Sequence, residues 1–383
     1  MKRRLVIITE IISPYRIPLF NVLSEQPGVD LHVIFLAETD PSLRQWKVYK
    51  QEIRFSYEVL PSWRKQIAGY NVLLNRGLSR LLAAAKPDAI LCGGYNYFAS
   101  WQALWWARNR SIPFFLWSES NLQDIRKGRA LVELLKDEFF RQCRGFVVPG
   151  KSAAEYLLSH GIKRGTIFTA LNAVDNDLFA KEAAAARAEA NQLRTELALP
   201  ERYFLFAGRL VREKGVFELL SAYSMLHPEV RKQIALVFAG DGPCRGELEI
   251  RSASISPGLI KFVGFTQREQ LAAYYALAEM LILPTYSDTW GLVVNEAMAC
   301  GLPVVVSRLA GCVPDLVMED WNGRVVEPRD VRSLSSAMRS IAGCGKERLQ
   351  MGTNSLKRIA EYSPRVWSDG VVRMLESLGE TGG

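Results

Sequence analysis

The stretch that decides the fold is residues 281–307, LILPTYSDTWGLVVNEAMACGLPVVVS. Two apolar runs, Leu281–Leu283 and Pro303–Val306, are typical of buried strands in a parallel sheet. Between them Gly291 opens a short helical pattern, and Gly301 stands where a glycine commonly ends a helix. The stretch therefore predicts a strand, a loop, a helix and a second strand of an α/β sheet.

The loop before this helix is a candidate anion site. Free backbone N–H groups and the helix dipole both favour negative charge at such a place. Two carboxylates flank the loop, Asp288 and, eight residues later, Glu296. Acids that faced a phosphate would repel it, whereas acids accept hydrogen bonds from sugar hydroxyls readily. The combination predicts a pocket for a nucleotide-sugar.

The same stretch resembles the donor-site signature of the retaining GT-B glycosyltransferases of family 4, in which two glutamates are separated by seven residues. Asp288 stands at the place of the first glutamate and is one methylene shorter, and Glu296 is the second. The resemblance is strong over residues 201–330 and weak over residues 1–200. It implies the GT-B fold, an α/β architecture of two doubly wound Rossmann-like domains that face a cleft.

A second motif of that family follows the first strand of the C-terminal half. Gly208-Arg209 and Lys214-Gly215 match the family's Gly-Arg and Lys-Gly pairs around a short loop. A departing nucleoside diphosphate gathers negative charge, which two fixed cations and a helix N-terminus offset without a metal. Arg209 can grip a phosphate through two hydrogen bonds and Lys214 can act as a point charge. The alternative is that both are exposed loop residues without a role.

The resemblance also assigns roles to the remaining donor residues. It gives the ribose to Glu296 and places base contacts at Gly264 and Phe265, where an ordinary strand-end turn is the alternative. The implied donor-binding set is Gly208, Arg209, Lys214, Gly264, Phe265, Asp288, Gly291, Leu292, Val293 and Glu296. The candidate catalytic set is Arg209, Lys214 and Asp288, together with Glu119, which stands where this sequence departs from the family's usual histidine.

Glu119 belongs to the N-terminal half, where the family often carries a histidine that faces the anomeric carbon. The corresponding strand end here reads Trp117-Ser118-Glu119-Ser120. Glu119 could orient the acceptor hydroxyl or accept its proton, or it could simply cap a helix. Tyr15 and Arg16, which follow the first strand, are acceptor-side candidates. No GxGxxG motif follows that strand, which argues against an oxidoreductase.

Alternating strand and helix patterns in both halves predict doubly wound parallel sheets. We expect residues 40–66 to be irregular and Asn71–Ala85 to form a helix. The predicted domains are an acceptor-binding domain at 1–175, a polar helical connector with little to bury at 176–200, a nucleotide-sugar domain at 201–362, and a C-terminal helix at 363–383 that crosses back to the first domain.

Metal and cofactor sites receive little support from the sequence. The six cysteines form no CxxC pair, and the three histidines are far apart, so reduced thiols in a cytoplasmic protein are expected. Asp175-Asn176-Asp177 spells DxD, a metal–nucleotide motif of a different glycosyltransferase fold, and stays open as an alternative. The resemblance implies no cofactor and no obligatory metal.

Charge is distributed unevenly along the 383 residues. Residues 1–175 carry 24 Lys and Arg against 15 Asp and Glu, a net of +9, whereas residues 176–383 carry 24 against 25. Tryptophans accompany this basic excess at Trp46, at Trp63 beside Arg64 and Lys65, and at Trp101, Trp105 and Trp106. Aromatic and basic residues together suit an anionic membrane surface, although core packing is the alternative for Trp101 and Trp105. We expect no nucleic-acid partner and a peripheral location on the inner face of the plasma membrane.

The predicted function is transfer of a sugar, with retention, from a nucleotide-sugar to an acceptor hydroxyl. A cell-surface polysaccharide or a lipid-linked glycan is the product class that the family implies. Two alternatives share the fold: a nucleotide-sugar epimerase or hydrolase that cleaves the donor without an acceptor, and an inactive GT-B domain that only binds.

Overall fold

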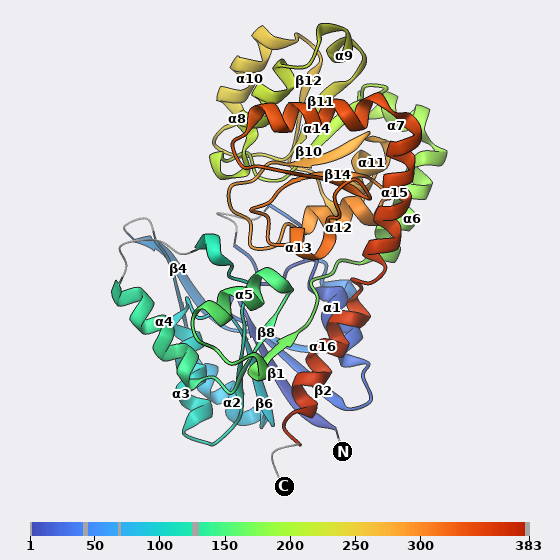
Figure 1. Ribbon diagram of the computed structural model, residues 1–383. Helices are drawn as coiled ribbons and strands as arrows, with labels where there is room; N and C mark the ends of the chain where they lie inside the picture. Colours follow the sequence, from blue (N-terminus) through green and yellow to red (C-terminus); the bar gives the residue numbers. More distant parts are fainter. Residues whose placement is uncertain (1, 41–44, 68–69, 125–129, 380–383) are drawn as a thin grey trace. The chain divides into compact units, whose positions relative to one another are not determined.

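The computed structural model describes residues 2–40, 45–67, 70–124 and 130–379. The chain divides into two compact units, which are described separately here. The first unit comprises Met1–Val174 and Pro364–Gly383, and the second comprises Asp175–Ser363. Figure 1 shows both chain termini in the first unit.

A parallel sheet in the order β3-β2-β1-β6-β7-β8-β9 forms the centre of the first unit. Its strands are β1 (Arg3–Thr9), β2 (Val29–Phe35), β3 (Ser56–Val59), β6 (Ala89–Gly93), β7 (Phe114–Trp117), β8 (Gly145–Val148) and β9 (Ile167–Thr169). Its helices are α1 (Ile17–Ser24), α2 (Leu78–Ala85), α3 (Phe98–Arg108), α4 (Ala130–Gln142), α5 (Lys151–Ser159) and α16 (Pro364–Glu376).

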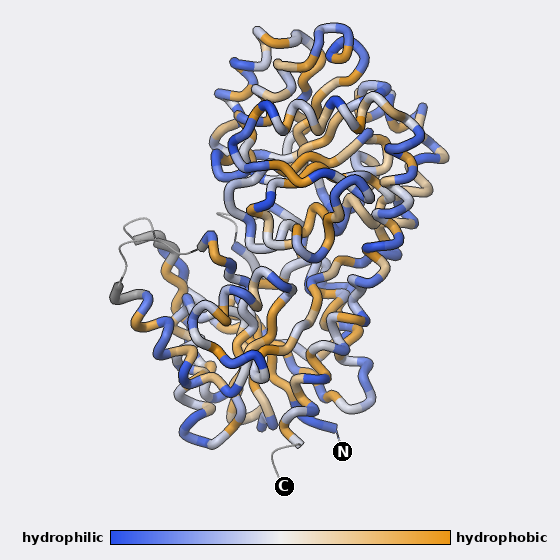
Figure 2. The backbone as a smooth tube through the Cα atoms, in the orientation of Figure 1, coloured by the Kyte–Doolittle hydropathy of each residue, from blue (hydrophilic) through white to orange (hydrophobic). Residues whose placement is uncertain are grey.

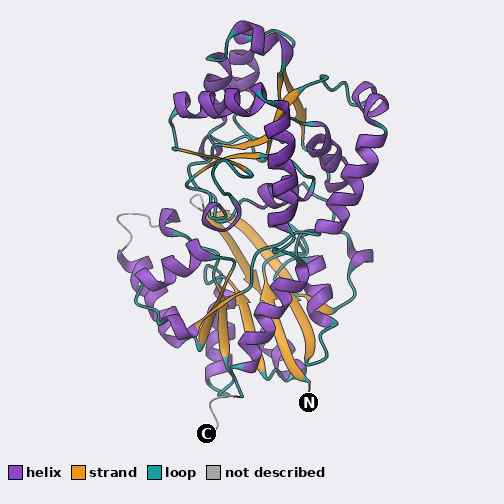
Figure 3. Ribbon diagram, turned by 45° about the vertical axis from the view of Figure 1, so that its right-hand side comes forward, coloured by secondary structure: helices purple, strands orange, loops and turns teal. Residues whose placement is uncertain are grey.

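Alternation along β1 divides the first unit's core into two layers. Leu5 and Ile7 point to the face covered by α1 and α16, and Val6 and Ile8 point to the face covered by α2, α3, α4 and α5. Trp367 of α16 is fully buried in the first of these layers. Figure 3 shows this sheet with helices on both faces, which is the doubly wound arrangement that the sequence predicts.

Two predictions for residues 40–85 are wrong. The supposedly irregular stretch contains β3 and β4 (Ser62–Ile67), and the helix expected over Asn71–Ala85 begins only at Leu78. The residues before it form β5 (Tyr70–Asn75), which pairs antiparallel with β4. Gly77, at φ 88° in the left-handed region, separates strand from helix.

The second unit also has a parallel sheet, in the order β12-β11-β10-β13-β14-β15. Its strands are β10 (Tyr203–Ala207), β11 (Ala235–Ala239), β12 (Ile260–Gly264), β13 (Met280–Leu283), β14 (Val304–Ser307) and β15 (Gly323–Val326). Its helices are α6 (Asn176–Ala188), α7 (Ala190–Glu196), α8 (Val216–Ser224), α9 (Pro228–Gln233), α10 (Arg245–Ile255), α11 (Arg268–Leu277), α12 (Leu292–Ala299), α13 (Val313–Leu316), α14 (Val331–Gly343) and α15 (Gly345–Ile359). Figure 2 shows the strands as the most continuous hydrophobic segments of this unit.

The sheet order reverses between β10 and β13. Numbered within the unit, the strands run 3-2-1-4-5-6, so loops that follow the first and fourth strands leave the sheet in opposite directions. A crevice for ligands forms at the carboxyl ends of the strands at such a switch point. The two predicted donor motifs directly follow β10 and β13.

Residues 176–200, expected to form a polar connector with little to bury, are part of the second unit. Helix α6 buries Phe179, Ala183 and Ala186 and packs against α11 and α12. An alanine-rich helix allows this close approach, since its small side chains leave room for the neighbouring helices. Across the residues that are described, no helix is both long and apolar enough to span a bilayer.

Candidate donor site

The loops at the switch point require glycine for steric reasons. A Cβ at Gly215 would lie 2.1 Å from the carbonyl oxygen of Pro284, which follows β13. A Cβ at Gly240, after β11, would lie 1.8 Å from the carbonyl oxygen of Gly208. Both contacts are far shorter than van der Waals separation, so only glycine lets these loops meet. The Gly-Arg and Lys-Gly pairs therefore bring the loop after β10 against its neighbours.

Lys214 and Asp288 form an ion pair across the two loops. The Nζ of Lys214 lies 2.5 Å from Oδ2 of Asp288, and the side chains are 22% and 18% exposed. The other carboxylate oxygen of Asp288 accepts a hydrogen bond from the backbone N–H of Trp290 at 3.3 Å. Lys214 has three donors, so one ion pair leaves capacity for a phosphate. The sequence did not reveal that these two residues are partners.

Helix α12 begins at Leu292, four residues after Asp288. Gly291 precedes the helix at φ 96°, and a Cβ there would approach a methyl carbon of Leu283 to 3.2 Å. The first N–H groups of a helix have no partner within it, so those of Leu292 and Val293 are available to an anion. The donor-binding role of these residues stays a prediction.

Backbone hydrogen bonds hold the donor loop in place. Gly311 N–H donates to the carbonyl of Asp288 at 3.0 Å, and Cys312 N–H donates to the carbonyl of Trp290 at 3.0 Å. Gly311 is a tight contact as well, since a Cβ there would lie 2.0 Å from the carbonyl oxygen of Thr289. The segment that precedes α13 thus supports the loop that carries Asp288.

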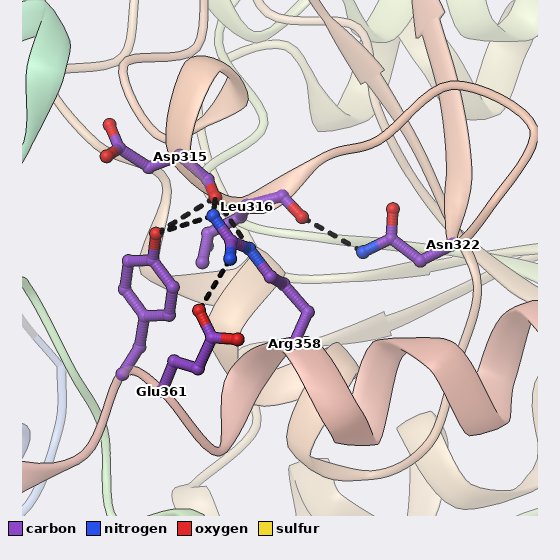
Figure 4. A network of polar contacts seen from close by, with 6 residues as sticks. Asp315, Leu316, Asn322, Arg358 and Glu361 are labelled. Atoms are coloured by element: carbon purple, nitrogen blue, oxygen red, sulfur yellow. Dashed lines mark hydrogen bonds and ion pairs between the residues drawn. The ribbon is translucent and has the colours of Figure 1, made fainter.

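Helix α13 is held in place in turn by hydrogen bonds from Arg358 of α15, from Tyr362 and from Asn322, as Figure 4 shows for the labelled residues. Arg358 Nε donates to the carbonyl oxygen of Asp315 at 2.9 Å, and the hydroxyl of Tyr362 donates to the same oxygen at 2.9 Å. Asn322 donates to the carbonyl of Leu316 at 2.9 Å. These bonds satisfy the free carbonyls at the helix end, and they make the support of the donor loop rigid.

Glu296 lies one helical turn and a half into α12 and is partly buried. The hydroxyl of Tyr275, on α11, donates to its Oε2 at 2.8 Å. Burial raises the pKa of Glu296 to about 7, against the hydrogen bond from Tyr275 and the charge of Arg268, which both favour the ionised form. Sequence reasoning missed Tyr275, because an aromatic residue at a helical spacing of apolar residues reads as core.

Arg209 and Phe265 are the exposed members of the predicted set. The guanidinium of Arg209 makes no hydrogen bond or ion pair within the described part of the chain, so it is available to a ligand. Phe265 is 40% exposed after β12, next to Gly264 at φ 77°. The N–H of Gly240 donates to the carbonyl of Gly264 at 2.8 Å, which holds this strand end beside the loop after β11.

The first unit contains a separate polar cluster at the carboxyl ends of β1 and β7. Arg16 Nη2 lies 3.3 Å from Oε1 of Glu119, and Arg16 Nη1 donates to the hydroxyl of Thr9 at 2.5 Å. The guanidinium stacks 4.4 Å from the ring centroid of Trp117, and Tyr15 is 5.9 Å away. The ion pair directs the Glu119 carboxylate toward Arg16.

The first two residues of the DxD sequence, Asp175 and Asn176, have structural contacts at the start of α6. Asp175 caps α6, because its Oδ1 accepts a hydrogen bond from the backbone N–H of Leu178 at 3.0 Å. Asn176 donates to the carbonyls of Ile359 and Tyr362 at 3.0 Å each. Within the described ranges, no group of three or more His, Cys, Asp or Glu could hold a metal ion.

The chain matches two known families of glycosyltransferases. Residues 189–358 match the family described as "Glycosyl transferases group 1", and residues 23–178 match the family described as "Glycosyltransferase Family 4". The fold resembles HepE of Anabaena, solved with UDP and glucose, at a TM-score of 0.75 and 15% identity over 98% of this chain and 100% of that one. Two Rossmann-like sheets with these loops define a GT-B glycosyltransferase fold. The chain belongs to the GT-B glycosyltransferases of family 4.

Curated relatives match over part of their length. The sulfoquinovosyl transferase SQD2 of Arabidopsis thaliana is 32% identical over 183 residues, which are 47% of this chain and 34% of the relative. The O-antigen chain mannosyltransferase B of Escherichia coli is 30% identical over 136 residues, which are 35% of each chain. The chain therefore spans about a third of the length of these relatives.

Proposed function

We propose that the protein transfers a sugar from a nucleotide-sugar donor to an acceptor hydroxyl, with retention at the anomeric carbon. The observation that carries the proposal is the meeting of Lys214, Asp288 and the N-terminus of α12 at the switch point of the second sheet. A cation, a hydrogen-bond acceptor and free N–H groups at one place suit a diphosphate joined to a sugar.

The site is proposed to accelerate the reaction by electrostatic stabilisation. As the bond between the anomeric carbon and the phosphate oxygen breaks, Arg209, Lys214 and the α12 N–H groups stabilise the charge that gathers on the diphosphate. The acceptor oxygen bonds to the anomeric carbon on the same face, and its proton passes to the departing phosphate. Asp288 accepts a hydrogen bond from a sugar hydroxyl, and Glu296 binds the ribose. No obligatory metal enters the proposed reaction.

The acceptor is proposed to be a cell-surface polysaccharide or a lipid-linked glycan. The relative named for O-antigen chains supports this class. In the first unit, Arg16 and Glu119 lie together at 3.3 Å and provide a donor and an acceptor for sugar hydroxyls. Glu119 is proposed to orient the attacking hydroxyl, with Tyr15 on the same side.

A peripheral site on the inner face of the plasma membrane is also proposed. Of the residues expected there, Trp63, Lys65 and Trp105 are exposed, whereas Arg64 and Trp101 are engaged within the protein. Arg64 is 18% exposed and pairs with Glu10 and Asp40, so it is not a free basic group. Trp101 packs on Phe139 with ring centroids 4.9 Å apart, whereas Trp105 is 51% exposed. Among the described residues of this unit, the exposed large apolar side chains are Trp63, Leu74, Phe98, Trp105, Leu122, Leu134 and Leu135.

Helices α3 and α4 carry part of this set of exposed apolar side chains. They are adjacent through Trp101 and Phe139, and Figure 1 shows them side by side. Leu134 and Leu135 on α4 and Trp105 on α3 are exposed and offer apolar surface, and Arg108 is exposed on α3, where it donates to Oε1 of Gln142 on α4. Such a surface suits anionic lipid headgroups.

The proposed activity is tested by turnover with a panel of nucleotide-sugars and glycan acceptors, with the anomeric configuration of the product read by NMR. Acceptor-dependent release of a nucleoside diphosphate, with a product of the donor's configuration, supports the proposal. Donor cleavage or epimerisation that needs no acceptor would favour an epimerase or hydrolase instead. Binding without turnover of any donor would favour an inactive binding domain.

A further inference from the structure

Tyr275 has a geometry that the fold alone does not require. It lies on α11, is fully buried, and directs its hydroxyl to Oε2 of Glu296 at 2.8 Å. Within the described part of the chain, Oε1 of Glu296 has no hydrogen-bond partner. One carboxylate oxygen is therefore held by the protein and the other is left open.

The ring of Tyr275 is itself held by helix α6 of the same unit. Phe179, on α6, packs edge-to-face on Tyr275, with ring centroids 6.4 Å apart and planes at 66°. The carbonyl oxygen of Phe179 accepts a hydrogen bond from Sγ of Cys300, at the end of α12. Helix α11 packs against both α6 and α12. The tyrosine thus has little freedom to move away from Glu296.

A fixed carboxylate has a clear advantage for binding. The terminal torsion of a glutamate is broad, so an unheld carboxylate must be ordered when a ligand arrives. A buried tyrosine hydroxyl that bonds one oxygen orders the group beforehand and satisfies an acceptor that would otherwise be buried without a partner. The free oxygen is then directed before the ligand binds.

We propose that Tyr275 is a positioning residue: by holding Oε2 of Glu296, it presents Oε1 to the ribose hydroxyls of the donor nucleotide. This inference rests on the function proposed above, since it assigns Glu296 to a ribose. The inference gives α11 a role in the donor site, and it assigns to Phe179 the role of keeping Tyr275 in position.

The test separates a ribose-directed role from general packing. Dissociation constants are measured by calorimetry for UDP, GDP, ADP and CDP and for the matching 2′,3′-dideoxynucleoside diphosphates, with wild type and Tyr275→Phe. The variant is expected to bind the preferred ribonucleotide about tenfold more weakly, because a hydrogen bond to a charged group is lost. Its affinity for the dideoxy analogue should stay within about twofold of wild type.

Two further variants complete the experiment. Tyr274→Phe removes a hydroxyl from the neighbouring position of the same helix and should leave both affinities unchanged. In a Glu296→Gln background, Tyr275→Phe should bring no further loss that is specific to the ribonucleotide, because the group it positions is gone. A loss of the same size in that background would overturn the proposal.

The remaining outcomes also decide the matter. If Tyr275→Phe loses equal affinity for both nucleotides, the tyrosine only supports packing and the inference fails while the donor site stands. If the variant binds as wild type does, the inference fails in the same way. If wild type binds no nucleoside diphosphate at all, the proposed function fails and this inference fails with it.

Discussion

The Nζ of Lys214 lies 2.5 Å from Oδ2 of Asp288, although 74 positions separate the two residues in the chain. Such a partly exposed pair contributes little to stability, typically below about 1 kcal/mol. It does keep a cation and an acceptor together where the loops that follow β10 and β13 leave the sheet. A donor that binds there meets a lysine whose charge is already positioned.

Exchange of each acid for its amide should separate the two carboxylates of the donor site. Glu296→Gln is expected to weaken donor binding more than Asp288→Asn, because Glu296 is assigned to the ribose and Asp288 to a single sugar hydroxyl. Titration of the donor into both variants measures the difference. Equal losses, or the reverse order, would mean that the roles of the two acids are exchanged.

Glu296 should also make stability depend on pH. Its pKa is raised to about 7 in the folded protein, from an ordinary value of 4.5, because burial disfavours the charged form. The folded state therefore holds the proton more tightly, and the stabilisation present below the ordinary pKa is lost as pH rises through about 7.

Glu296→Gln lacks this titration. Its free energy of unfolding should rise relative to wild type between about pH 5 and pH 8, by on the order of 2 kcal/mol. Urea denaturation of both proteins at several pH values measures the difference. A difference that stays constant across this range would show that burial does not raise the pKa of Glu296.

The reaction should proceed in excess chelator. Arg209, Lys214 and the N-terminus of α12 offset the charge of the leaving group, and Asp175 is engaged as the cap of α6. Turnover is measured with EDTA and again after addition of manganese or magnesium. Activity that vanishes with EDTA and returns with either ion would support a metal site at the DxD sequence and would contradict a metal-free reaction.

Anionic liposomes should bind the protein reversibly at low salt. Leu134→Ser combined with Leu135→Ser should reduce cosedimentation, because these side chains supply exposed apolar contact on α4. Leu349→Ser is a matched control, since Leu349 is 69% exposed but lies in the second unit. Salt should weaken binding, because each surface cation contributes only about 1 kcal/mol. Wild type that stays in the supernatant at low salt would refute the membrane surface.

Much of the fold could be predicted because local patterns and tertiary packing agree. Leu281–Leu283 and Pro303–Val306 were predicted as strands and are observed as β13 (Met280–Leu283) and β14 (Val304–Ser307), within one residue of the predicted bounds. These runs are buried on both faces of a parallel sheet, so they are apolar throughout and stand out in the sequence. The fold class is confirmed by both sheets.

The prediction failed where pairing with another segment or side chain decides the structure. Asn71–Asn75 reads as the start of the helix that follows, but its pairing with Ser62–Gln66 makes it a strand. Arg64 reads as a surface charge, whereas Asp40, which is 2% exposed, and Glu10 surround it. The partners of Arg64 lie 54 and 24 positions away in the chain, and no local pattern announces either pairing.

The candidate site shows the same division. Glycines with steric demands, such as Gly215, can be recognised from a motif. The partner of Glu296 could not be, because Tyr275 resembles any buried aromatic residue of a helix. The pairing of Arg16 with Glu119 is likewise visible only once β1 and β7 lie in one sheet.

The central claim is that Arg209 and Lys214 stabilise the charge of a departing nucleoside diphosphate, and turnover of the single variants tests it most directly. Arg209→Ala and Lys214→Ala should remain folded and lose turnover by on the order of a hundredfold or more. Arg212→Ala is the control, since Arg212 lies in the same loop but pairs with Glu247 at 2.9 Å, and it should keep wild-type turnover. Wild-type turnover in Arg209→Ala or Lys214→Ala would contradict the account.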